Sequence, residues 1–141
     1  ESVRLYYQGR PEVSGFEVAD KAVAGDRAGA LESLAWALHH GVPRVLLADA
    51  LAEAVHAIAR VRALGNVDAS AAAELGMSPR RVKNAQAQGR AWDSESIAAA
   101  VVVVAALNGD VKGQAADADF ALTDAVVRVA GLRPAGRRRA G

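Results

Sequence analysis

The run IAAAVVVVAAL at residues 97–107 decides the fold, because its eleven consecutive residues carry no polar side chain and no other stretch of the chain is like it. A helix that is apolar on every side offers no face to water, so it lies among other helices or is covered by another subunit. The run is too short to span a membrane, which takes about 20 apolar residues, and Asn108, Asp110 and Lys112 follow it directly. The sequence therefore predicts a core element around which the rest of the chain packs.

The four valines of this run also fit a buried strand, since β-branched residues favour that state. Its flanks favour a helix. Asp93 offers a capping side chain and Glu95 an acid in the first turn, where helix amide groups lack partners. At the other end Lys112 places a cation near the negative end of the helix, and Gly113 tolerates the left-handed conformation that often follows one. We predict a single helix over residues 94–112.

Composition limits the protein class. The 141 residues suffice for one domain with a real core, and the net charge of +1 demands neither nucleic acid nor a membrane as a partner. The absence of cysteine excludes disulfides and thiolate metal sites, which fits a reducing, cytoplasmic location. The chain opens on Glu1 and not on methionine, so we expect a fragment of a longer protein.

Apolar spacing and turn residues predict an all-α bundle of about seven helices, with no strand pair. The predicted helices run from Phe16 to the turn at 25–26, then over 27–40, 43–64, 69–75, 79–90, 94–112 and 116–131. Residues 1–15 contain Gly9, Pro11 and Gly15 and are expected to form the tail of a preceding unit plus a linker, whereas the basic tail at 132–141 is expected to be disordered. The side chains expected on the buried faces include Phe16, Ala19, Val23, Leu31, Leu34, Ala35, Leu38, Val45, Leu46, Ala48, Leu51, Ala52, Val55, Ile58, Ala59, Phe120, Leu122, Val126, Val127 and Val129.

No residue pattern predicts catalysis, a metal site or a nucleotide site, so we expect no cofactor and no enzymatic activity. His39 and His40 are adjacent and point about 100° apart on a helix, and His56 stands alone on an apolar helix. Neither a phosphate-binding loop nor a His-Glu-x-x-His or Gly-x-Ser-x-Gly motif occurs. Asp117 and Asp119 lie at the start of the predicted helix over 116–131, where carboxylates serve as caps.

One local pattern is typical of a helix-turn-helix. A small residue at Ala72, a glycine at Gly76 and a β-branched residue at Val82 would let two short helices cross closely. The second helix displays side chains of the types that contact phosphates and base edges, namely Arg80, Arg81, Lys83, Asn84, Gln86, Gln88 and Arg90. Two readings remain open: a DNA-reading helix with Arg80, Arg81, Lys83 and Asn84 as contacts, or an ordinary helix crossing with a solvated outer face.

Three further stretches match a known family in order and spacing over residues 3–132. They are YYQGRPEVSGFEVAD at 6–20; Ala72 and ELGM at 74–77 with Val82 and Trp92; and LNGDVKG at 107–113 with Ala118-Asp119 and Ala121-Leu122. Together they resemble the C-terminal part of the delta subunit of bacterial DNA polymerase III, the clamp loader subunit, in a form that looks actinobacterial. The resemblance implies the end of the lid domain at residues 1–15 and the helical collar domain at 16–131.

In that family, delta opens the ring-shaped sliding clamp through its first domain, which this sequence would lack, and the collar holds delta in a ring of five with gamma or tau and delta prime. Delta does not hydrolyse ATP, and the holoenzyme around it is a DNA-directed DNA polymerase. The resemblance thus implies an oligomerisation domain for DNA replication, in contact with DNA only in the full complex and with no membrane partner.

A collar buries flat apolar faces against its neighbours. The run at 97–107 has more apolar surface than one small domain readily covers, so we expect the last two helices to carry the subunit contact. The expected interface residues are Ile97, Val101, Val103, Val104, Leu107, Phe120 and Val126.

Overall fold

The computed structural model describes residues 11–64, 76–113 and 117–134. These residues form helices and no strand, which confirms the all-α prediction. The six helices that they contain are α2 (Pro11–Val23), α3 (Arg27–His39), α4 (Arg44–Leu64), α6 (Pro79–Gly89), α7 (Ser94–Lys112) and α8 (Ala118–Leu132). The seventh helix predicted at 69–75 lies outside the described residues, as do residues 1–10 of the predicted lid segment and residues 135–141 of the predicted tail.

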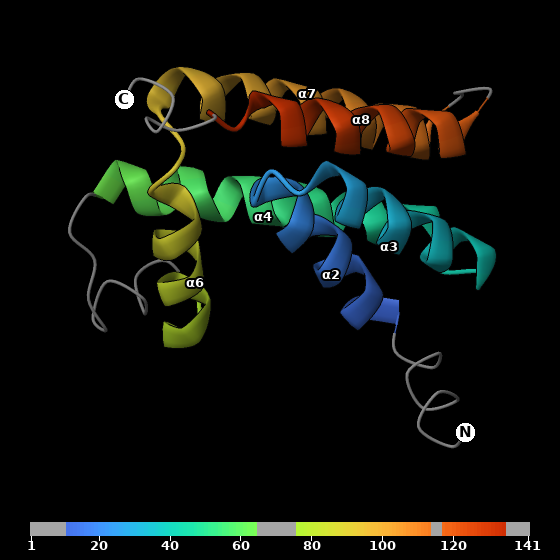
Figure 1. Ribbon diagram of the computed structural model, residues 1–141, viewed down its shortest axis with the longest axis horizontal. Coiled ribbons are helices and arrows are strands. Elements are labelled where there is room, and N and C mark those ends of the chain that lie inside the picture. Colours follow the sequence, from blue (N-terminus) through green and yellow to red (C-terminus); the bar gives the residue numbers. More distant parts are fainter. Residues whose placement is uncertain (1–10, 65–75, 114–116, 135–141) are drawn as a thin grey trace.

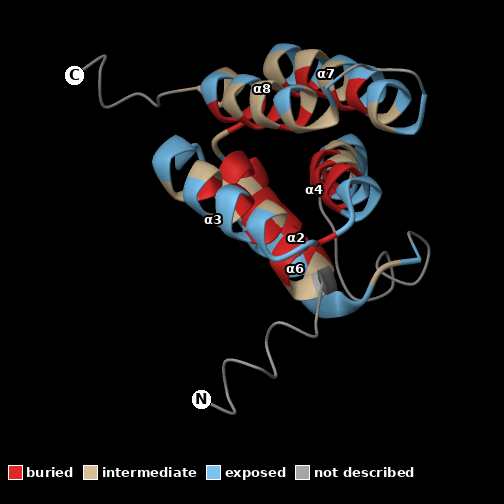
Figure 2. Cartoon of the chain, turned by 90° about the vertical axis from the view of Figure 1, so that its right-hand side faces the viewer, coloured by how far each residue is buried: buried red, intermediate tan, exposed pale blue. Residues whose placement is uncertain are grey.

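The longest of these helices, α4, is the centre of the bundle, and it contacts α2, α6, α7 and α8. Figure 1 shows α7 and α8 side by side as one layer, with α4, α2 and α3 beneath them and α6 crossing near the C-terminal end of α4. The buried residues of both layers face each other, whereas the outer side of α7 is exposed or half-buried (Figure 2). One side of the apolar run packs on α4 and α8, whereas its outer side is not covered by the described part of this chain. Of the two arrangements that the sequence allowed, the run therefore does not occupy the middle of the bundle, which belongs to α4.

The ends of the helices lie close to their predicted positions because local residues determine them. Asp93 caps α7 by accepting a hydrogen bond from the Ser96 amide at 2.8 Å, and the Asp93 amide donates in return to the Ser96 hydroxyl at 3.1 Å. Gly25 and Gly41, which end α2 and α3, have φ of 80° and 78°. Gly113 ends α7 as predicted, but it does not use the left-handed conformation that glycine tolerates: its φ is −99°, and its amide donates to the Gly109 carbonyl.

The first helix of the described residues, α2, begins earlier than predicted, at Pro11, so residues 11–15 are helical and do not form a linker turn. Gly15 lies inside this helix and packs closely on α4. A Cβ atom at Gly15 would lie only 3.0 Å from the Cβ of Ala50. Glycine here therefore serves helix packing, and its turn-forming tendency is not used.

Several predicted core residues are exposed, because the buried face of each helix depends on where its neighbours lie. The exposed ones are Phe16, Ala35, Val45, Leu46 and Phe120. The core uses other residues that the predicted faces omitted, among them Val18, Ala22, Ala30, Ala37, Leu47, Ala50, Ala54 and Val61. On α4 the buried set is wide because α2, α6, α7 and α8 together surround most of its circumference.

The segment between α6 and α7 is attached to the core through Trp92. This side chain is buried, and its indole Nε1–H donates to the Val23 carbonyl at the end of α2 over 2.9 Å. Arg62 of α4 donates to the Trp92 carbonyl at 2.8 Å. The predicted Val82 is also buried, in a small cluster with Ala57 and Val61 of α4. The first helix of the predicted helix-turn-helix, with Ala72, lies outside the described residues.

Candidate interface surfaces

The two faces of α7 differ sharply in burial. Ile97, Ala100, Val104 and Leu107 point into the core. On the opposite side Ala98, Val102, Ala105 and Ala106 are exposed, and the side chain of Val102 is 68% exposed. A surface made only of alanine and valine offers water no hydrogen-bonding group, so its burial against another surface is favourable.

A groove of about 330 Å³ runs between this side of α7 and the adjacent face of α8. Phe120, at the first turn of α8, forms part of its wall and is 67% exposed. Asp124 and Arg128 of α8 lie on the rim and pair with each other at 2.8 Å. An apolar groove with a polar rim is the arrangement found at protein interfaces. We call the exposed side chains Ala98, Val102, Ala105, Ala106 and Phe120 the α7–α8 outer face.

The structure divides the seven residues of the predicted interface into two groups. Val101 and Val103 are half-buried and Phe120 is exposed, so a partner could reach them. The other four are packed inside the chain's own core: Ile97, Val104, Leu107 and Val126. The predicted set omitted Val102, the most exposed valine of the run. Its direction could have been read from the sequence, because Ile97 and Leu107, the largest residues of the run, share the face opposite to it.

By length and composition alone, α7 could cross a membrane, which is true of no other helix in the described part of the chain. Core helices of globular domains pass the same test. One face of α7 is packed on α4 and α8, and Glu95, Asp110 and Lys112 lie within its length. These features are typical of a bundle helix with one uncovered side.

The outer face of α6 is basic. Arg80, Lys83, Asn84 and Arg90 are exposed, and their spacing places them on one side of the helix. Arg81, the remaining predicted DNA contact, is directed elsewhere. Its guanidinium lies 3.9 Å from the Glu53 carboxylate and 5.7 Å from the centre of the Phe16 ring. The structure therefore leaves three of the four predicted DNA contacts accessible and ties the fourth to α4 and α2.

An ion pair joins the start of α4 to the start of α8. Arg44 donates through Nε and Nη2 to the two carboxylate oxygens of Asp119. These hydrogen bonds hold the pKa of Asp119 below its ordinary value and raise the pKa of Arg44. Asp117 caps α8 as predicted, by accepting from the Phe120 amide at 3.0 Å, whereas Asp119 serves this cross-helix pair.

The histidines have structural neighbours. His40 stacks on Trp36 with 3.9 Å between ring centres, and the His39 ring meets the His40 ring edge-on. Over residues 11–64, 76–113 and 117–134, no three His, Asp or Glu side chains are grouped so that they could hold a metal ion.

Comparison with known proteins gives one informative likeness, of the fold. Neither a scan against protein-family models nor a search of curated proteins found a match. Among solved structures, the chain is similar to the Bacillus subtilis DNA clamp loader delta protein (YqeN), with a TM-score of 0.74 and 19% sequence identity. The match covers 86% of this chain and 37% of that one, so this chain spans little more than a third of its structural neighbour. The chain has the helical fold of that part of a clamp loader delta protein.

Proposed function

We propose that this chain is an assembly domain, the collar of a bacterial clamp loader delta subunit, and that it performs no reaction of its own. In this role it holds delta beside gamma or tau and delta prime in the cytoplasm, during loading of the sliding clamp onto primed DNA. The predicted division at residue 15 falls inside α2, because Pro11–Val23 form one helix of the bundle. We therefore propose that the collar begins at Pro11 and runs to residue 131, with the lid domain before it. Contact with the clamp would be made by a domain that this sequence does not include.

The observation that carries the proposal is the α7–α8 outer face on a fold that is similar to a clamp loader delta protein. In a domain of this size, exposing Val102 and Phe120 on the same surface has an unfavourable hydration free energy that a neighbouring subunit would remove. We propose that α7 and α8 make the subunit contact, through the half-buried Val101 and Val103 and the exposed Val102 and Phe120.

The direct test mixes the purified chain with the gamma or tau and delta prime subunits of the same organism and separates the complexes by size-exclusion chromatography. We expect this chain to elute with those subunits. If it elutes alone at protein concentrations well above the dissociation constant expected of a stable complex, the proposal is wrong.

The same protein is titrated into labelled duplex DNA at physiological salt, to test the alternative of a helix-turn-helix regulator. With a net charge of +1 we expect weak binding without sequence preference. Sequence-selective binding that is lost on Arg80→Ala, with no elution beside the clamp loader subunits, would favour the regulator.

A further inference from the structure

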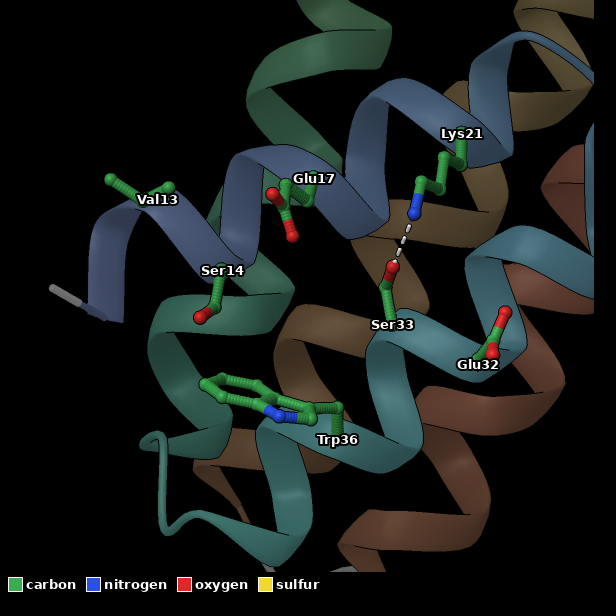
Figure 3. Close-up of a pocket in the computed structure, with 7 residues that line it drawn as sticks. All are labelled: Val13, Ser14, Glu17, Lys21, Glu32, Ser33 and Trp36. Atoms are coloured by element: carbon green, nitrogen blue, oxygen red, sulfur yellow. Dashed lines mark hydrogen bonds between the residues drawn. The ribbon is translucent and has the colours of Figure 1, made fainter. Parts of the chain in front are cut away.

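A second surface feature lies on the other side of the molecule, between α2 and α3. It is a pocket of about 430 Å³ lined by Val13, Ser14, Glu17, Lys21, Glu32, Ser33 and Trp36. Figure 3 shows the Trp36 indole on one side of the pocket, with Ser14 and Glu17 of α2 across from it. Trp36 is 40% exposed, and the His40 ring stacks on its indole. The ring is therefore held in place by its neighbour while part of its surface stays open to a ligand.

Over the described residues Ser14 is the one polar residue among the buried ones, with 8% of its surface exposed. Its hydroxyl is directed into the pocket (Figure 3), where the oxygen can accept a hydrogen bond from a ligand. A ligand with an N–H donor would gain a hydrogen bond to this oxygen.

The charges of the pocket favour a cation. Glu17 and Glu32 contribute two carboxylates. The single ammonium group, that of Lys21, is directed away from Ser14 and donates to the Ser33 hydroxyl at 2.7 Å (Figure 3). This leaves an aromatic surface, a hydroxyl oxygen and the Glu17 carboxylate together at one end of the pocket, all of them groups that attract a positively charged donor.

We propose that this pocket binds the guanidinium group of an arginine side chain presented by a partner protein. A planar guanidinium can stack on the Trp36 indole while it donates to the Glu17 carboxylate and to the Ser14 hydroxyl. An ammonium group is also attracted to the ring and to the carboxylate, but it has neither a plane that can stack on the indole nor a fork of donors, so we expect the pocket to prefer arginine to lysine. This inference is independent of the proposed assembly role, because it concerns other helices and is tested with another probe.

The test uses the indole N–H signals of the two tryptophans in a ¹⁵N-labelled sample. Trp36 reports on the pocket. The buried Trp92 reports on folding, since its indole N–H donates a hydrogen bond to the Val23 carbonyl. The probes are arginine, lysine and citrulline, each capped at both ends as in a peptide; citrulline has the shape of arginine without its charge. We expect a saturable shift of the Trp36 signal with capped arginine, binding about fivefold weaker or more with capped lysine, and no saturable shift with capped citrulline.

Two variants test the residues. Glu17→Gln keeps the shape of the side chain and removes its charge. We expect this variant to weaken the binding of capped arginine about fivefold. Ser14→Ala should weaken the binding of capped arginine by a smaller factor. Glu95→Gln on α7 is the matched control: it removes one exposed carboxylate far from the pocket and should change nothing.

Equal responses to capped arginine and capped lysine would overturn the proposal, and so would Glu17→Gln behaving like Glu95→Gln while the Trp92 signal shows an intact fold. If free arginine binds far more tightly than capped arginine, the natural ligand is a small molecule and not a side chain of a partner protein. That result would overturn this part of the proposal.

Discussion

Trp92 shows how one side chain can fix a connection between helices. Its indole N–H reaches the last residue of α2, and its carbonyl accepts from Arg62 of α4. The turn that leads from α6 into α7 is thereby attached to two other helices. Because α7 starts at Ser94, directly after this turn, the contacts of Trp92 also fix the position of the first turn of α7.

Replacing this residue by Trp92→Phe should lower the free energy of unfolding by about 2–3 kcal/mol, since it removes the indole donor, leaves the Val23 carbonyl without its partner and opens a small cavity. Urea unfolding followed by circular dichroism measures the change. Trp36→Phe is the control, because Trp36 is half-exposed and should change stability by less than about 0.5 kcal/mol. Equal effects of the two substitutions would contradict the anchoring role of Trp92.

The capping carboxylate of Asp93 predicts a pH dependence. Hydrogen bonds from Ser96 keep the pKa of Asp93 below its ordinary value. A group whose pKa is lowered in the folded state stabilises the fold above its unfolded pKa, and this contribution is lost as the pH falls through the folded value. Wild-type stability should therefore fall between about pH 5 and pH 2, and more steeply than that of Asp93→Asn, which still caps but does not titrate. Parallel curves of urea midpoint against pH for the two proteins would exclude this contribution.

Residue-level features of this kind were predictable where they are local. The caps at Asp93, Ser78 and Asp117 follow from side chains within three residues of the amides that they bond. The hydrogen bond of Trp92 joins residues 69 positions apart, and no local pattern carries that information.

Two glycines inside helices show that the packing of a helix against its neighbours and its intrinsic helix propensity have separate effects on stability. Gly15 lies in α2 against Ala50 of α4, whereas Gly109 lies in α7 with no atom within 4 Å of the position of a Cβ. Both sit inside helices, where alanine is intrinsically favoured by about 1 kcal/mol. Only at Gly15 does the neighbouring helix oppose the added methyl group.

We therefore expect Gly15→Ala to destabilise the protein by about 1–2 kcal/mol and Gly109→Ala to stabilise it by about 0.5–1 kcal/mol. Thermal or urea unfolding measures both. In the Ala50→Gly background the contact partner of the new methyl group is gone, so Gly15→Ala should lose most of its effect. Stabilisation by Gly15→Ala in the wild-type background would show that α2 and α4 are less closely packed than described.

The same contrast explains which parts of the element pattern the sequence predicted. The bounds of α7 and α6 are set by caps, turns and apolar spacing along the chain, and these were predicted closely. Which side of a helix is buried depends on distant elements, so Phe16 and Phe120 were assigned to the core and are exposed. The apolar run of α7 has no polar residue, so its pattern does not indicate which side of the helix is buried, except through the positions of its two largest side chains.

The molecule as a whole has a covered and an uncovered apolar surface, both on α7. Val104 is buried in the core, whereas Val102 is exposed. A charge at each position should thus have a different consequence. Val104→Asp places an unpaired carboxylate in the core, which costs several kcal/mol, about the whole stability of a domain of this size, and the protein should be unfolded by circular dichroism. A cooperative melt close to that of the wild type would contradict the placement of Val104.

The most direct test of the central claim, that the α7–α8 outer face is a subunit contact, is the affinity of the Val102→Asp protein for the gamma or tau and delta prime subunits. This variant should melt like the wild type, because Val102 is exposed, yet bind those subunits about tenfold more weakly or worse, because a carboxylate would be buried in the interface. Ala87→Asp, which adds the same charge to an exposed position on α6, should bind like the wild type. If Val102→Asp binds as tightly as Ala87→Asp and the wild type, the α7–α8 outer face is not the contact and the account is wrong.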